Sequence, residues 1–234
     1  MKKFLLLPAL LLLAIGCKKE EEQKPKVIYK TVPAPKLEVD TAEIQLADLP
    51  VEIPGTQVLL HPVGQYRVHD GAKRKGYSYE RGSYTVSNYG EYELTGYLQN
   101  IMVQSKESDS THAIFDIPVL IQSATFLQGH AEATGDRLFV YALSDRDTNR
   151  DGKLDANDVK ALYLSHVSGR DLIKISPELE ELIDWNYVST HHRLYFRSIE
   201  DSNKNGAFDK DDKMNYNYLD LNQKPWEVKA YEPF

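Results

Sequence analysis

Residues 137–166 read RLFVYALSDRDTNRDGKLDANDVKALYLSH, and residues 193–221 read RLYFRSIEDSNKNGAFDKDDKMNYNYLDL. In both stretches a short apolar and aromatic segment precedes an acidic loop, and a second β-prone segment follows it. The two loops begin 54 residues apart, at Asp147 and Asp201. Tyrosine alternates with asparagine after the second loop, which is typical of a strand. The sequence therefore predicts a repeated unit of strand, acidic loop, strand, turn and strand, with each loop at the end of a β-hairpin.

The rest of the chain beyond residue 55 is also β-prone. Short segments rich in β-branched and aromatic residues are separated by turn-rich segments, the pattern of an all-β sandwich, barrel or propeller. We predict strands at 57–60, 66–68, 97–104, 117–122, 138–143, 162–167, 172–175, 194–197 and 216–221. Residues 177–183 are the exception, because Ser176 as an N-cap and Pro177 at the first position predict a helix. The predicted fold class is all-β, as propeller-like blades or a small β-sandwich with the acidic loops between strands.

Both loops have the residue pattern of a calcium loop of the EF-hand type. Asp or Asn stands at positions 1, 3 and 5, Gly at position 6, an apolar residue at position 8 and Asp at position 12. Ca²⁺ prefers oxygen ligands, which these short side chains and the backbone carbonyl at position 7 supply. Gly152 and Gly206 permit the sharp turn of each loop. The predicted ligands are Asp147, Asn149, Asp151, Lys153 and Asp158 in residues 147–158, and Asp201, Asn203, Asn205, Ala207 and Asp212 in residues 201–212.

Position 12 sets the expected affinity. A bidentate Glu at this position closes the ligand shell, but both loops have the shorter Asp, so we expect dissociation constants on the order of 10⁻⁵ to 10⁻³ M. The second loop has Asn205 where the first has Asp151, and we therefore predict that it binds calcium more weakly. A full EF-hand also needs flanking helices, whereas we predict strands on both sides of each loop. The alternative is a pair of Asx-rich turns that bind no metal.

The N-terminus has the features of an export signal. Lys2 and Lys3 precede an apolar run over residues 4–15, which has the length of a signal h-region and is too short to span a bilayer. The run ends in Ala14-Ile15-Gly16-Cys17, which resembles the lipobox of bacterial lipoproteins and implies acylation of Cys17. The charged run at 18–23 is similar to the acidic export signal of surface lipoproteins of the Bacteroidota. We predict a signal peptide at 1–16, a charged and Pro-rich flexible linker at 17–55, and a β domain at 56–234.

Charge and cysteine content exclude several functional classes. Cys17 is the only cysteine, so acylation leaves no thiol for a disulfide, a zinc site or a nucleophile. The net charge is −7, and removal of Lys2 and Lys3 with the signal makes it −9. An acidic domain of this kind argues against nucleic acid as a partner. The sequence also lacks GxSxG, HExxH, P-loop and GxGxxG motifs.

The repeated unit resembles the blades of TolB-like propellers. The resemblance covers about residues 130–234 and includes Asp184-Trp185, Arg193-Leu194-Tyr195-Phe196 and Trp226-Glu227-Val228 in blade order. The same stretch is similar to uncharacterised lipoproteins of the Bacteroidota. A propeller of six or seven blades needs far more than the 179 residues from 56 to 234. A partial or four-blade arrangement, or a sandwich, therefore stays open.

These features lead us to expect an outer-membrane lipoprotein that faces the periplasm or the cell surface. Its β domain would bind about two calcium ions and act as a non-catalytic binding or structural module. The tyrosine-rich residues 77–97 or the loop face would then contact a protein or glycan partner. One alternative is a calcium-dependent hydrolase that acts on glycans or peptides. Another alternative is a dockerin-like module. The 54-residue loop spacing and the strand-like flank of the second loop argue against it.

Overall fold

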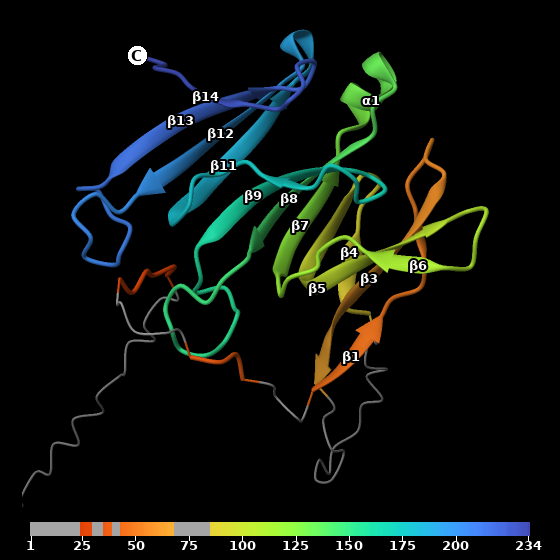
Figure 1. Cartoon of the computed structure of the whole chain (residues 1–234), viewed down its shortest axis with the longest axis horizontal. Helices are drawn as coiled ribbons and strands as arrows, with labels where there is room; N and C mark the ends of the chain where they lie inside the picture. Colours follow the sequence, from red (N-terminus) through yellow and green to blue (C-terminus); the bar gives the residue numbers. More distant parts are fainter. Residues whose placement is uncertain (1–23, 30–34, 39–42, 68–84) are drawn as a thin grey trace, which may run out of the picture.

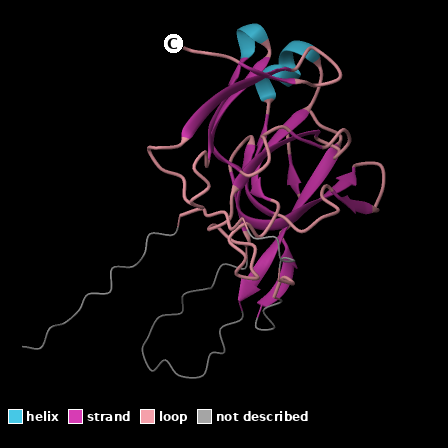
Figure 2. Ribbon diagram, turned by 60° about the vertical axis from the view of Figure 1, so that its left-hand side comes forward, coloured by secondary structure: helices cyan, strands magenta, loops and turns pink. Residues whose placement is uncertain are grey.

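The computed structural model describes residues 24–29, 35–38, 43–67 and 85–234. The predicted signal peptide and Cys17 lie outside these ranges, as do residues 77–84 of the tyrosine-rich region. The described residues form two antiparallel β-sheets with little helix (Figures 1 and 2), which confirms the all-β prediction. None of the helices in the described ranges has the length and apolar character that crossing a membrane requires.

The first sheet contains ten of the described strands, with β1, β3, β5, β7, β8, β9 and β10 as successive neighbours and β2, β4 and β6 paired beside them. Their bounds are β1 (Glu43–Ala47), β2 (Val51–Glu52), β3 (Val58–Arg67), β4 (Ser87–Tyr89), β5 (Glu93–Ser105), β6 (Thr111–Ala113), β7 (Leu120–Phe126), β8 (Leu138–Ser144), β9 (Lys160–His166) and β10 (Ile173–Lys174). A short helix, α1 (Gln128–Thr134), connects β7 to β8. The second sheet has the order β11 (Glu180–Val188), β12 (Arg193–Glu200), β13 (Lys213–Asp220) and β14 (Val228–Ala230).

The predicted repeat is present as two four-strand meanders, β7 to β10 and β11 to β14. In each meander consecutive strands pair antiparallel, and the acidic loop joins the second strand to the third. Strands therefore flank both loops, as the sequence predicts. The described residues contain two such meanders, one in each sheet, and the resemblance of this unit to TolB-like blades stays a prediction.

Two apolar cores lie on opposite faces of β8 and β9. Phe139 and Tyr141 pack in the first core, which the large sheet encloses with its own strands. Leu138 and Val140 pack in the second core, against Phe196 and the other inner residues of the second sheet. A strand that is buried on both faces has a continuous apolar sequence instead of alternation. This explains why residues 138–143 are apolar throughout.

The predicted helix at 177–183 is wrong. Leu179 has a φ of +60°, which does not continue a right-handed helix, and the chain enters β11 at Glu180. Leu182 then packs in the second core, and Glu181 lies buried with its carboxylate 3.0 Å from the ammonium of Lys160. Pairing with β12 and burial of these two side chains outweigh the local N-cap signals.

The ordered sheet begins within the segment predicted as a flexible linker. β1 pairs with β3 from Glu43 to Ala47, β2 pairs with β3 at Val51, and Ile53 is fully buried in the first core. The prolines of this segment are compatible with these strands because they lie beside them and not inside them. The first sheet therefore includes β1 and β2, which lie in the segment predicted as the linker.

A histidine–tyrosine–histidine cluster connects α1 to the second sheet. The hydroxyl of Tyr187 on β11 lies 3.2 Å from Nδ1 of His130 on α1 and 3.1 Å from Nδ1 of His192. His192 ends the short 3-10 turn at Ser189–His191. His130 is 1% exposed, and its Nε2 has no hydrogen-bond partner. Burial lowers the pKa of His130, and the neighbouring His192 adds to this effect.

We predict that His130 makes folding stability depend on pH in the acidic range. Because its pKa is lowered in the folded state, the unfolded chain takes up the proton first as pH falls below about 6.5. Stability therefore decreases with falling pH until the folded-state pKa is reached. Chemical denaturation of the wild type and of His130→Phe at pH 7.5 and 5.5 measures this. The variant should lose less stability between these pH values. An equal loss in both proteins would contradict the prediction, and His191→Gln provides the control at an exposed histidine.

Candidate functional site

The two acidic loops project from the same end of the molecule. The first extends from the β8–β9 hairpin of the large sheet, and the second from the β12–β13 hairpin of the small sheet (Figure 1). All ten predicted ligands lie in these loops. The two loops therefore bring the ends of the two sheets together at one side of the β domain.

Position 1 holds the turn of each loop by equivalent hydrogen bonds. The Asp147 carboxylate accepts a hydrogen bond from the backbone N–H of Gly152 at 2.9 Å, and the Asp201 carboxylate accepts one from Gly206 at 2.8 Å. The two glycines have φ values of +85° and +87°. Position 4 is also left-handed in both loops, with Arg150 at +58° and Lys204 at +55°. The two loops thus share a left-handed backbone at positions 4 and 6 in spite of their different sequences.

The side chains at positions 3 and 5 repeat this equivalence. The side-chain oxygen of position 3 accepts from the N–H of position 5, and that of position 5 accepts from the N–H of position 7. The four distances are Asn149 from Asp151 at 2.9 Å, Asp151 from Lys153 at 2.8 Å, Asn203 from Asn205 at 2.9 Å, and Asn205 from Ala207 at 2.7 Å. These Asx turns direct the side-chain oxygens toward the inside of each loop.

Position 12 closes each loop. The Asp158 carboxylate accepts hydrogen bonds from the backbone N–H groups of Thr148 at 2.7 Å and Asp155 at 2.9 Å. Asp212 accepts from the N–H groups at the same two positions of its loop, at 3.0 and 2.9 Å. Asp158 is fully buried, and this burial raises the pKa of its carboxyl group although the backbone hydrogen bonds act in the opposite direction. A cation nearby would offset this cost of burying a carboxylate.

The donor set of each loop fits calcium in its chemistry. All the side-chain donors are oxygen atoms, and each loop adds the backbone carbonyl of position 7. Within the described ranges, no group of three or more His, Cys, Asp or Glu side chains is placed so that it could hold a metal ion. The predicted ligands also include oxygens that are not from these four residue types. They are the side-chain amides of Asn149, Asn203 and Asn205 and the backbone carbonyls at position 7. The loops therefore present mixed amide, carbonyl and carboxylate oxygens, and not the compact carboxylate cluster of a tight metal site.

A segment near the N-terminus runs between the two loops and bonds to both. This segment, residues 24–29, is here termed the strap, and Figure 1 shows it in red beside the loops. The N–H of Val27 donates to the carbonyl of Gly206 at 2.9 Å, and the N–H of Ile28 donates to the carbonyl of Thr148 at 2.9 Å. Val27 is 4% exposed. The sequence predicted residues 24–29 as part of the flexible linker, and no sequence pattern indicated their hydrogen bonds to the loops.

Two further contacts fix the N-terminal segments to the loops. Tyr29 hydrogen-bonds the carboxylate of Asp201, and burial together with this bond raises the pKa of Tyr29 to about 12. The N–H of Glu38 donates to the carbonyl of Gly152 at 2.7 Å. Each glycine at position 6 therefore gives its N–H to its own loop and its carbonyl to an N-terminal segment.

The tyrosine-rich region predicted as a partner surface is described only from residue 85. In that part, Tyr89 and Tyr97 are exposed on β4 and β5. The hydroxyl of Tyr89 donates to the backbone carbonyl of Glu52 at 3.0 Å. A binding role for this region stays a prediction.

Comparison with protein-family models, curated proteins and solved structures gives no match for this chain. Its function is therefore argued from the loops, the strap and the surfaces of the two sheets alone.

The strap gives the two loop glycines different tolerance to substitution. A Cβ at Gly206 would lie 2.5 Å from the carbonyl oxygen of Val27, whereas a Cβ at Gly152 would lie 3.5 Å from the nearest atom, in the side chain of Glu38. Both positions have a positive φ, which costs an alanine about 1–2 kcal/mol. We therefore predict that Gly152→Ala loses about this amount of unfolding free energy, and that Gly206→Ala loses more because the strap must move.

Urea denaturation of the two variants tests this prediction, with each serving as the control for the other. The left-handed strain is common to both, so the difference between them reports the contact with the strap. Equal losses would show that residues 24–29 do not hold the second loop in solution.

Proposed function

We propose that this chain is a membrane-anchored envelope lipoprotein whose β domain binds calcium in two hairpin loops and serves as a binding or structural module. The observation that carries the proposal is the equivalence of the loops. Positions 1, 3, 5, 6, 7, 9 and 12 make the same hydrogen bonds in both, although only some of their residues are identical. Two unrelated acidic turns have no reason to repeat this arrangement.

Bound calcium would supply positive charge among carboxylates that otherwise repel one another. The residues of the loops then act as a scaffold. Asp147 and Asp201 hold the N–H groups at position 6 and so orient the peptide units of Gly152 and Gly206. The carbonyls of these glycines accept bonds from the N-terminal segments. Calcium that restricts the motion of the loops would therefore also restrict the motion of the strap. Because the strap bonds to a loop of each sheet, we infer that calcium stabilises the contact between the two sheets.

The short distance along the chain from Cys17 to the strap supports an anchored arrangement. Lys24 is the seventh residue after Cys17, and a fully extended chain spans at most about 3.6 Å per residue. If Cys17 is acylated, Lys24 at the start of the strap lies within about 25 Å of the acylated residue. We accordingly propose that the loop end of the β domain faces the outer membrane, on the periplasmic or the extracellular side.

Calcium titration of the purified full-length chain tests the proposal. We expect two binding events with dissociation constants on the order of 10⁻⁵ to 10⁻³ M, the weaker one at the second loop. When calcium is about 100 times the dissociation constant, each site adds about 2.7 kcal/mol of stability, which corresponds to a rise in Tm of about 5–10 °C. Calorimetry and thermal melts with calcium and with chelator measure these effects.

Variants separate the two loops. Asp147→Ala should remove the tighter event and Asp201→Ala the weaker one, so the first substitution should reduce total affinity more. Asp116→Ala, at an exposed aspartate outside both loops, provides the control. If calcium titration releases or absorbs no heat and does not shift Tm, the loops are Asx turns without a metal, and the calcium proposal is wrong. The hydrolase alternative requires turnover on glycan or peptide panels that disappears in Asp147→Ala.

A further inference from the structure

The outer face of the second sheet carries a cluster of tyrosines. Strand registers pair Arg197 with Tyr216 and Tyr195 with Tyr218, and paired residues share one face of a sheet. The N–H of Tyr231 donates to the carbonyl of Tyr216 at 3.0 Å, which places Tyr231 beside the same row. The opposite face of these strands holds the buried side chains of the second core. The four tyrosines are only half-buried, in a position where an antiparallel sheet usually has polar side chains.

The tyrosine rings support one another in a fixed geometry. Tyr231 meets Tyr195 edge-on with ring centroids 5.4 Å apart, and it meets Tyr216 edge-on at 5.9 Å. Tyr195 and Tyr218 lie 5.7 Å apart. Such contacts stabilise each ring and limit its rotation. The face is therefore a preformed aromatic surface, and a ligand that binds there does not have to order it.

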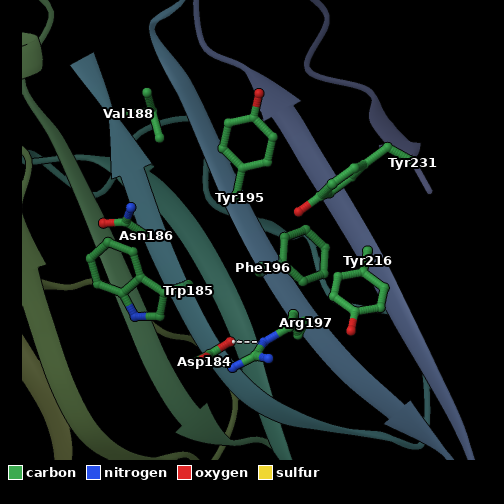
Figure 3. Close-up of a pocket in the computed structure, with 9 residues that line it drawn as sticks. All are labelled: Asp184, Trp185, Asn186, Val188, Tyr195, Phe196, Arg197, Tyr216 and Tyr231. Carbon is green, nitrogen blue, oxygen red and sulfur yellow. Dashed lines mark hydrogen bonds and ion pairs between the residues drawn. The ribbon is translucent and has the colours of Figure 1, made fainter. Parts of the chain in front are cut away.

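A groove of about 410 Å³ crosses this face from β11 to the segment after β14 (Figure 3). Its volume lies in the range of small-molecule sites, and its lining combines aromatic rings with polar groups that could orient a ligand. The polar groups are the amide of Asn186, the hydroxyls of Tyr195, Tyr216 and Tyr231, and the ion pair of Asp184 and Arg197. Figure 3 shows this ion pair at one end of the groove and the tyrosines along its side.

The charges in the groove compensate each other. Nε of Arg197 donates to Asp184 at 2.7 Å, and a second bond from the same guanidinium completes a bidentate pair. Arg197 is thereby not available as a free cation for a phosphate or sulfate, and Asp184 is not available as a free anion for a cationic ligand. This balance favours a neutral ligand that has apolar faces for the rings and hydroxyl groups for the polar side chains.

We propose that this groove binds a neutral oligosaccharide, with sugar rings stacked on Tyr216 and Tyr231 and hydroxyls bonded to Asn186 and the Asp184–Arg197 pair. The proposal deepens the binding role proposed above and rests on it. A peptide ligand is less suited, because sheets bind peptides by adding a strand at an edge, whereas this groove crosses the face and offers side-chain groups. Among the described residues that line the groove, Asp184 is the one carboxylate, and glycoside hydrolysis needs two, so the geometry supports binding without cleavage.

The test is titration of the full-length chain with neutral hexasaccharides of glucose, mannose, galactose or xylose, in a detergent without a sugar headgroup. Calorimetry and tyrosine and tryptophan fluorescence follow the binding. At least one hexasaccharide should bind, and Tyr216→Ala or Tyr231→Ala should weaken it by about tenfold or more. Tyr216→Phe, which keeps the ring, should retain most of the affinity. Ile117→Ala removes an exposed apolar side chain outside the groove, the loops and the tyrosine-rich region, and should leave binding unchanged.

Several outcomes would overturn the inference. These are failure of all four hexasaccharides to bind at millimolar concentration, binding that persists in both alanine variants, and tyrosine-dependent binding of a peptide or a sulfated glycan alone. Calcium melts on the same preparations test the proposed calcium role separately. Saccharide binding through the tyrosines without a calcium response would sustain the groove and overturn the calcium sites. A calcium response without saccharide binding would support the calcium sites and overturn the proposed saccharide groove.

Discussion

The backbone hydrogen bonds of Val27 and Ile28 join the two acidic loops, and through the loops they join the two sheets. The first loop belongs to the large sheet and the second to the small one, so a segment of six residues bridges both at one end. At the other end, Tyr187 bonds to His130 and to His192 and connects α1 to the small sheet. Between these two connections lies the second core, where Val140 packs in the same cluster as Phe196. The position of one sheet against the other is thus set at both ends and in the middle.

This arrangement assigns different tasks to the two faces of the small sheet. Its inner face supplies apolar side chains such as Leu194 and Leu219 to the core. The outer face carries Tyr195, Tyr216 and Tyr231, which pack on one another beside a groove. A rigid inner contact keeps the outer surface in a fixed shape, which is the condition for binding without a large entropic cost. Calcium in the loops would strengthen this rigidity at the end where the strands β12 and β13 turn.

The repeat could be predicted from sequence because its signals are local. Alternation after Asp212 and the Asp and Asn spacing in both loops identify strands and turns within a dozen residues. Signals that depend on distant partners were missed. The strap is too short for any periodicity, and its partner Gly206 is 179 residues from Val27 along the chain. The helix signals of Ser176 and Pro177 were local and misleading, because pairing of β11 with β12 and burial of Leu182 decided that segment. The groove escaped prediction because it depends on the register of four strands.

We propose that the loops bind calcium and that the strap couples the bound loops to both sheets. Amide hydrogen exchange at Val27 and Ile28, measured by NMR during a calcium titration, tests this coupling. Both amides donate to loop carbonyls, so their exchange should slow as calcium is added, in parallel with that of Gly152 and Gly206. Loop amides that become protected while those of Val27 and Ile28 do not, or no change at any of the four, would contradict it.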